Sequence, residues 1–179
     1  MALKSAAKTV FLLCALALFA ACGGNGCLDN QSAIPLAGFY SAETGQQIGI
    51  SSLEIHGIGA PGDTLLVTSG ATVQQVYLPM RSSKTSTAWC LHYTQGDLAD
   101  PAFNDTIEFT YNTLPYFVSE ECGASFRYHI TQLRYTRHLI DSVAVTDSLV
   151  TNIDTERIQI FFRTAEEPDD SDSPENPAE

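Results

Sequence analysis

Two side chains on one predicted strand, Cys90 and His92, are the pair best placed for covalent chemistry. They alternate with Trp89, Leu91 and Tyr93, so an extended chain puts Cys90 and His92 on the same face of the strand. A thiol beside an imidazole can pair a nucleophile with its general base, or supply two metal ligands. The competing interpretation is that the aromatic residues fill the core while the small residues face the less crowded side. We favour this second interpretation.

A second pattern consists of an Asp, then a hydroxyl residue, then an aliphatic residue. It resembles the O-glycosylation motif of Bacteroidota envelope proteins, in which the hydroxyl residue is the acceptor. The structural alternative is that Asp and Ser or Thr end turns and the aliphatic residue starts a strand. Both can hold at once, because glycans need exposed hydroxyls beside strands. The four triplets predict acceptors at Thr64, Thr106, Ser142 and Ser148.

Other motifs of catalysis or metal binding are missing from the sequence. It has no glycine-rich phosphate loop, no His-Glu-x-x-His and no Gly-x-Ser-x-Gly. The pair Asp170 and Asp172 suggests a calcium loop, but Pro174 stands where a third oxygen ligand is needed and no glycine follows. We therefore expect no metal and no cofactor.

The first 21 residues predict a lipoprotein signal peptide. Lys4 and Lys8 precede an apolar run over 10–21, which is shorter than the roughly 18 or more apolar residues of a membrane span. The run closes with Leu18-Phe19-Ala20-Ala21-Cys22. This segment resembles a bacterial lipobox with Phe19 where Leu is usual, and predicts lipidation of Cys22. The alternative is an ordinary secretory signal in which Cys22 is incidental.

The charge of the chain limits its partners. The formal net charge is −12, and loss of Lys4 and Lys8 with the signal makes it −14. No basic stripe exists that could contact phosphates, so nucleic acid is excluded as a partner. Electrostatic binding to anionic lipid is excluded for the same reason. Attachment to a membrane would therefore come from acyl chains on Cys22.

Composition divides the mature chain into three parts. Residues 22–33 form a glycine-rich tether after the lipidated Cys22, and the lack of an acidic run there favours the periplasmic face of the outer membrane over the cell surface. Residues 34–163 form one domain. Residues 164–179 hold seven acidic and no basic residues, which predicts a disordered tail.

The domain is expected to be all-β. Residues of alternating polarity are separated by Gly, Pro, Asn and Asp, and no stretch keeps an apolar period of 3.6 residues. Ile158, Ile160 and Phe162 are predicted to point inward, and a change of parity near Thr131-Gln132 predicts a β-bulge. This pattern favours a two-sheet antiparallel sandwich of immunoglobulin- or transthyretin-like type. The expected strands are 36–40, 48–56, 63–68, 72–78, 87–94, 105–111, 124–135, 142–150 and 157–162.

The cysteines predict one disulfide bond. Cys14 is lost with the signal and Cys22 is acylated, which leaves three thiols in an oxidising compartment. Cys27 and Cys122 lie in irregular backbone that can adapt to the geometry of a bridge. We expect a Cys27–Cys122 bond with Cys90 reduced and buried. The alternative, a Cys90–Cys122 bond with Cys27 free, stays open.

Several segments of the mature chain form a distinctive combination: Cys27 and the segments 39–45, 117–119 with Cys122-Gly123, 139–142 and 158–162. On these residues the mature chain resembles a family of small, uncharacterised Bacteroidota lipoproteins defined as a domain of unknown function. The resemblance implies an envelope location and a β-rich fold, and it carries no activity. A looser likeness to transthyretin-like modules of outer-membrane proteins comes from the Glu-Thr-Gly turn followed by residues 48–57.

Two functions follow from these observations. The first is a non-enzymatic accessory or binding lipoprotein of the outer membrane, whose exposed sheet or loops contact another envelope protein or a glycan. The second is a small thiol-dependent hydrolase that uses Cys90 and His92. The lipid anchor, the predicted sandwich and the lack of a catalytic motif favour the first.

Overall fold

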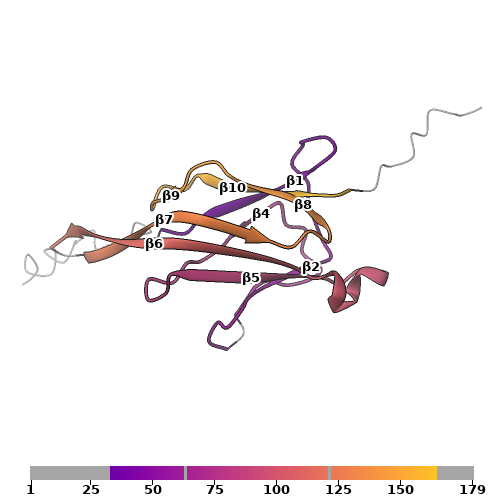
Figure 1. Ribbon diagram of the computed structural model, residues 1–179, viewed down its shortest axis with the longest axis horizontal. Coiled ribbons are helices and arrows are strands. Elements are labelled where there is room, and N and C mark those ends of the chain that lie inside the picture. Colours follow the sequence, from indigo (N-terminus) through magenta and orange to yellow (C-terminus); the bar gives the residue numbers. More distant parts are fainter. Residues whose placement is uncertain (1–32, 63, 121, 165–179) are drawn as a thin grey trace, which may run out of the picture.

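The computed structural model describes residues 33–62, 64–120 and 122–164, which form two β-sheets (Figure 1). The larger sheet has the strand order β3 (Leu65–Val67), β2 (Leu53–Gly57), β5 (Ser86–Tyr93), β6 (Asp105–Ser119), β7 (Gly123–Tyr135) and β9 (Leu149–Val150). The smaller has the order β4 (Gln75–Tyr77), β1 (Leu36–Ser41), β10 (Glu156–Phe162) and β8 (Ile140–Val145). Two 3₁₀ helices, η1 (Gly96–Ala99) and η2 (Pro101–Phe103), lie between β5 and β6. The prediction of an all-β fold with two sheets is confirmed.

One hydrophobic core is shared by the two sheets. Every second residue of β5 is buried, and on β10 Ile158, Ile160 and Phe162 are buried as predicted. Aromatic rings meet edge to face within each sheet, with centroids 5.4 Å apart for Phe39 and Phe162. Such pairs add stability beyond the area they bury. No helix in the described ranges is long and apolar enough to cross a bilayer.

The expectation of a purely antiparallel fold is wrong for one pair of strands. The larger sheet is antiparallel throughout, but β1 and β10 run parallel, with Phe39 opposite Ile160 and Ser41 opposite Phe162. Consecutive antiparallel strands are joined by short turns that fix their directions. Because β1 and β10 are the first and last strands, no turn connects them. The sequence therefore did not determine whether the two strands run parallel or antiparallel to each other.

Two predicted strands are interrupted where the chain moves between sheets. The strand expected over 48–56 begins only at Leu53, since Ile50 makes an isolated bridge to Val73. The strand expected over 142–150 is two strands, β8 in the smaller sheet and β9 in the larger. Between them, Asp147 accepts a hydrogen bond from the Leu149 N–H at 2.9 Å. An aspartate that caps the backbone two residues later makes a turn, which ends the strand.

The bulge predicted near Thr131-Gln132 is confirmed. Thr110 pairs with Gln132 and Tyr111 with Ile130, so Thr131 is the extra residue. Before the bulge, Tyr128 and Ile130 face the core, and the extra residue lets the out-of-phase residues Leu133 and Tyr135 face the same side after it. Strand β6 is much longer than the predicted 105–111 and continues to Ser119. Its second half lacks the polar and apolar alternation on which the prediction depended.

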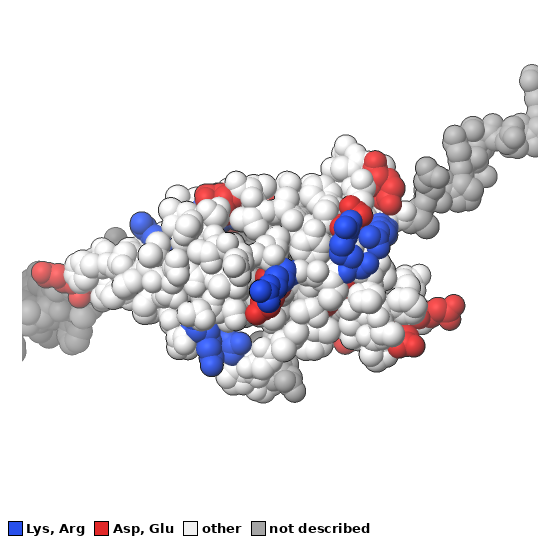
Figure 2. Space-filling model, in the orientation of Figure 1, with Lys and Arg blue, Asp and Glu red and all other residues white. Residues whose placement is uncertain are grey.

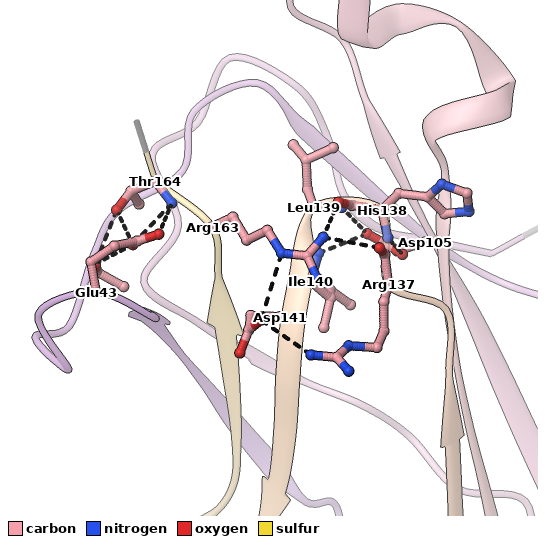
Figure 3. A network of polar contacts seen from close by, with 10 residues as sticks. Glu43, Asp105, Arg137, His138, Leu139, Ile140, Asp141, Arg163 and Thr164 are labelled. Atoms are coloured by element: carbon pink, nitrogen blue, oxygen red, sulfur yellow. Dashed lines mark hydrogen bonds and ion pairs between the residues drawn. The ribbon is translucent and has the colours of Figure 1, made fainter. Parts of the chain in front are cut away.

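A buried carboxylate, that of Asp105, joins the larger sheet to the crossover that leads into β8 (Figure 3). The side chain is fully buried and accepts five hydrogen bonds of 2.7–2.9 Å. A buried carboxylate needs such partners, because desolvation without them costs several kcal/mol or more. The donors are the Tyr93 and Thr136 hydroxyls and the backbone N–H groups of His138, Leu139 and Ile140.

Asp105→Asn is expected to lower the free energy of unfolding by about 3 kcal/mol, because the amide turns an N–H₂ group toward donors that then lose their acceptor. Urea unfolding followed by tryptophan fluorescence measures the change. Asp141→Asn is the matched control. Asp141 is partly exposed and pairs with Arg137 at 3.2 Å and Arg163 at 3.6 Å, so its loss should cost less than about 1 kcal/mol. Equal losses in the two variants would contradict the role given to Asp105.

Candidate functional site

The outer face of β5 carries the predicted pair. Cys90 and His92 both point away from the core, as the alternation indicated, and both are half-buried. Cys90 was expected to be buried, and this is wrong, because its side chain is only half-buried. The outer face has no second layer of strands over it. The sequence did not indicate Asn104, whose Oδ1 lies 2.8 Å from His92 Nδ1 and whose side chain also hydrogen-bonds the Cys90 thiol.

The environment of Cys90 favours the protonated thiol. Burial raises the pKa of the thiol above its ordinary value of 9.0, and the charge of Asp105 raises it further, while the hydrogen bond from Asn104 lowers it. A reactive cysteine has the opposite shift, because the thiolate is the nucleophile. Within the described residues no three His, Cys, Asp or Glu side chains come together as a metal site.

A cleft of about 400 Å³ lies at the end of the domain where β5 and β10 finish. This volume is within the range of small-molecule sites. Its walls are more apolar than polar, and the polar residues Ser51, Ser52 and Gln95 are among those that line it. Residues lining it include Ile48, Ile50, Tyr93, Leu98, Leu139 and Phe162, with Arg163 and Thr164 also contributing.

The positive charge of Arg163 at this cleft is already engaged. Its Nη1 donates to the backbone oxygens of Arg137 at 3.1 Å and His138 at 2.9 Å, and its Nε lies 3.6 Å from Asp141 (Figure 3). In Figure 2 the basic side chains form small separate groups on the face shown, some of them beside acidic side chains. The cleft therefore presents an apolar wall with no uncommitted guanidinium.

Glu43 holds the segment after β10 in place. Its carboxylate accepts from the Thr164 hydroxyl at 2.5 Å, from the Thr164 N–H at 3.1 Å and from the Ser41 hydroxyl at 3.0 Å (Figure 3). These bonds, that of the Thr164 hydroxyl above all, lower the pKa of the Glu43 carboxyl from 4.5 to about 2. The ionised form is the one that the bonds favour, so the contact persists down to strongly acid pH.

The other predicted site residues are scattered. Cys22 and Cys27 lie outside the described residues, and Cys122 is not a free thiol. Among the predicted acceptors, Thr64 is exposed, whereas Thr106, Ser142 and Ser148 are half-buried. Asp147, before Ser148, accepts from the Leu149 N–H, which fits the turn interpretation of the triplet. Asp105, before Thr106, instead accepts from the distant crossover that includes Ile140. Glycosylation stays a prediction, and Thr64 is its most accessible acceptor.

Sequence reasoning missed the free end of the β6–β7 hairpin. Large apolar side chains are exposed there, with Phe117 at 68% and Leu114 at 42%. The sequence did contain a signal for this exposed segment: residues 114–118 are five consecutive apolar residues, so polar and apolar side chains do not alternate there. Such a run on the surface of a folded domain marks a site of contact.

Residues 52–162, which include β2 to β10, match the model of a family of unknown function (DUF6452). The chain belongs to this family. The match covers the Cys90 strand, the Asp105 network and the long hairpin, so these features lie in the family's region. No curated protein and no solved structure matches the chain. The description of DUF6452 names no activity.

Alkylation of Cys90 in the native protein is expected to be slow at neutral pH and to keep accelerating above pH 9, because the raised pKa leaves little thiolate. Asn104→Ala should slow alkylation further, since it removes the hydrogen bond that lowers this pKa. Rates of iodoacetamide labelling against pH give the measurement, and the same thiol in the unfolded protein is the control. Rapid labelling of the native thiol at neutral pH would instead favour a thiol enzyme.

Proposed function

We propose that this member of DUF6452 is a lipid-anchored, non-enzymatic binding module of the bacterial outer membrane, with its domain on the periplasmic side. The cleft is the observation that carries the binding role. It is of ligand size and mainly apolar, and the one guanidinium that lines it is committed to backbone oxygens and Asp141. It therefore fits a neutral, largely apolar group, such as a side chain of an envelope protein or part of a glycan.

The thiol hydrolase is the second candidate, and Asn104 is the observation in its favour. This side chain contacts both Cys90 and His92, which is the kind of third group that orients a base beside a nucleophile. The raised pKa of Cys90 weighs against it. The cleft also gives it no support, because neither Cys90 nor His92 lines that cleft.

The lipid anchor is proposed from the segment that ends at Cys22. Resemblance to a lipobox and to Bacteroidota lipoproteins supports it, and two or more acyl chains would give stable attachment where one would not. Acylation at Cys22 leaves the domain on a tether of eleven residues before Ala33. The tether leaves the cleft free to meet a partner of the cell envelope.

Cys22→Ser in the full chain is expected to abolish acylation and move the protein from the membrane fraction to the soluble fraction. Metabolic labelling with palmitate and fractionation after a carbonate wash measure the two effects. Cys14→Ser is the control, because Cys14 lies in the apolar run that is removed, and this variant should stay membrane-bound and labelled. The anchor would be disproved by a Cys22→Ser protein that remains with the membranes.

The disulfide is proposed between Cys27 and Cys122. The register of the sheet argues against the alternative bond between Cys90 and Cys122. Cys90 lies opposite Thr106 near the start of β6, whereas Cys122 follows Ser119, the last residue of that strand. Thirteen residues of strand span roughly 40 Å, whereas bridged Cα atoms lie no more than about 7 Å apart. Cys90 is a free thiol in the structure.

Counting thiols in denatured, unreduced protein tests this pairing. The mature wild type should give one alkylated cysteine, Cys90, and Cys122→Ser should give two, because Cys27 loses its partner. Cys90→Ser is the control and should give none. The pairing would be refuted by three alkylated thiols in the wild type, or by a crosslinked peptide that contains Cys90.

A further inference from the structure

The β6–β7 hairpin extends past the rest of the domain as an arm, which we define as residues 112–119 of β6 and 123–127 of β7. Strand β5 pairs with β6 only as far as Thr110, and β9 pairs with β7 only at Tyr128 and His129. Beyond these points the two strands pair only with each other among the described strands. Figure 1 shows them projecting from one end of the molecule.

The arm continues the core-facing side of the larger sheet beyond the core itself. Residues 107, 109 and 111 of β6 are buried, and residues 113, 115 and 117 follow on the same face. Opposite them, Pro115 pairs with Phe126 and Phe117 pairs with Ala124. Exposure rises along this face from 6% at Tyr128 to 39% at Phe126 and 68% at Phe117. The described residues of the smaller sheet therefore leave this apolar face uncovered.

Charge is almost absent from the arm. Residues 112–119 and 123–126 contain no Asp, Glu, Lys or Arg. Arg127 is its one cation, and the guanidinium lies 4.1 Å above the ring of Tyr116, on the face that also carries Leu114. Aromatic side chains with few charges are typical of protein segments at the boundary between water and lipid.

Ala33, the first described residue after the tether, begins the segment that lies at the end of the domain that carries the arm. Pro35 accepts from the Leu78 N–H at 3.0 Å, and Met80 of the same segment accepts from the Tyr128 hydroxyl, 3.5 Å away at the base of the arm. Cys22 lies eleven residues before Ala33, a length of at most about 40 Å. From Tyr111 to Ser119 the arm extends roughly 25 Å. Acyl chains on Cys22 can therefore enter a bilayer that the end of the arm touches.

We propose that the arm places Tyr116, Phe117 and Phe126 in the interfacial layer of the bilayer that holds the acylated Cys22. This inference rests on the proposed lipid anchor. A zwitterionic surface suits it best, because Glu120 borders the arm and the whole chain is acidic. The tether itself is a poor cover for this face, since residues 23–32 contain a single large apolar side chain, Leu28.

A tryptophan reporter at the end of the arm tests the proposal in the lipidated full chain. Phe117→Trp protein is reconstituted in phosphatidylcholine vesicles, with or without bromine on the acyl chains near the headgroup. We expect its emission to shift to shorter wavelength and to be quenched by the brominated lipid. Phe103→Trp is the matched control. Phe103 is 41% exposed on η2, and Figure 1 shows the short helices at the end of the domain opposite the arm. A tryptophan there should show neither effect.

Trp89 is 1% exposed and adds the same background to both variants. Flotation of the vesicles separates failure of the anchor from failure of the arm. If both proteins float and bromine quenches neither reporter, the anchor stands and the arm proposal is overturned. A shift to shorter wavelength without bromine quenching would also overturn it, and would assign the face to a second copy of the chain. If neither protein floats, both proposals fail.

Discussion

The buried carboxylate of Asp105 is the interaction on which the two-sheet arrangement depends. Strand β7 belongs to the larger sheet and β8 to the smaller, and the chain between them turns around this one side chain. Three successive N–H groups point at it, as the backbone does around a bound anion. The crossover could otherwise satisfy these donors only by opening to water. Tyr93, whose pKa is raised chiefly by burial and also by Asp105, brings β5 into the same network.

This network gives the two ends of the domain different characters. At one end the Asp105 crossover, Arg163 and the Glu43–Thr164 contact surround a cleft and fix where β10 ends. At the other end β1 begins, and the arm leaves the domain without a covering sheet. An anchor near the arm and a cleft far from it would let the protein hold a membrane and a partner at the same time.

The sequence determined the features that depend on local periodicity. Alternation placed Cys90 and His92 outside and Ile158, Ile160 and Phe162 inside, and the change of parity in β7 located the bulge at Thr131. Side-chain direction in a strand is set by a period of two residues, so it can be read without knowing the neighbouring strand. The same reasoning gave an all-β class with two sheets.

Only the tertiary structure decided which strands are neighbours. The parallel pairing of β1 with β10 and the hydrogen bonds of Asp105 join residues far apart in sequence. The change of sheet at Asp147 is likewise defined by the different partner strands of β8 and β9. A turn-forming triplet looks the same whether its aspartate ends a hairpin or binds three N–H groups from a distant crossover. In the arm, periodicity is lost because neither face meets the core, and so its length became visible only when the sheets were assembled.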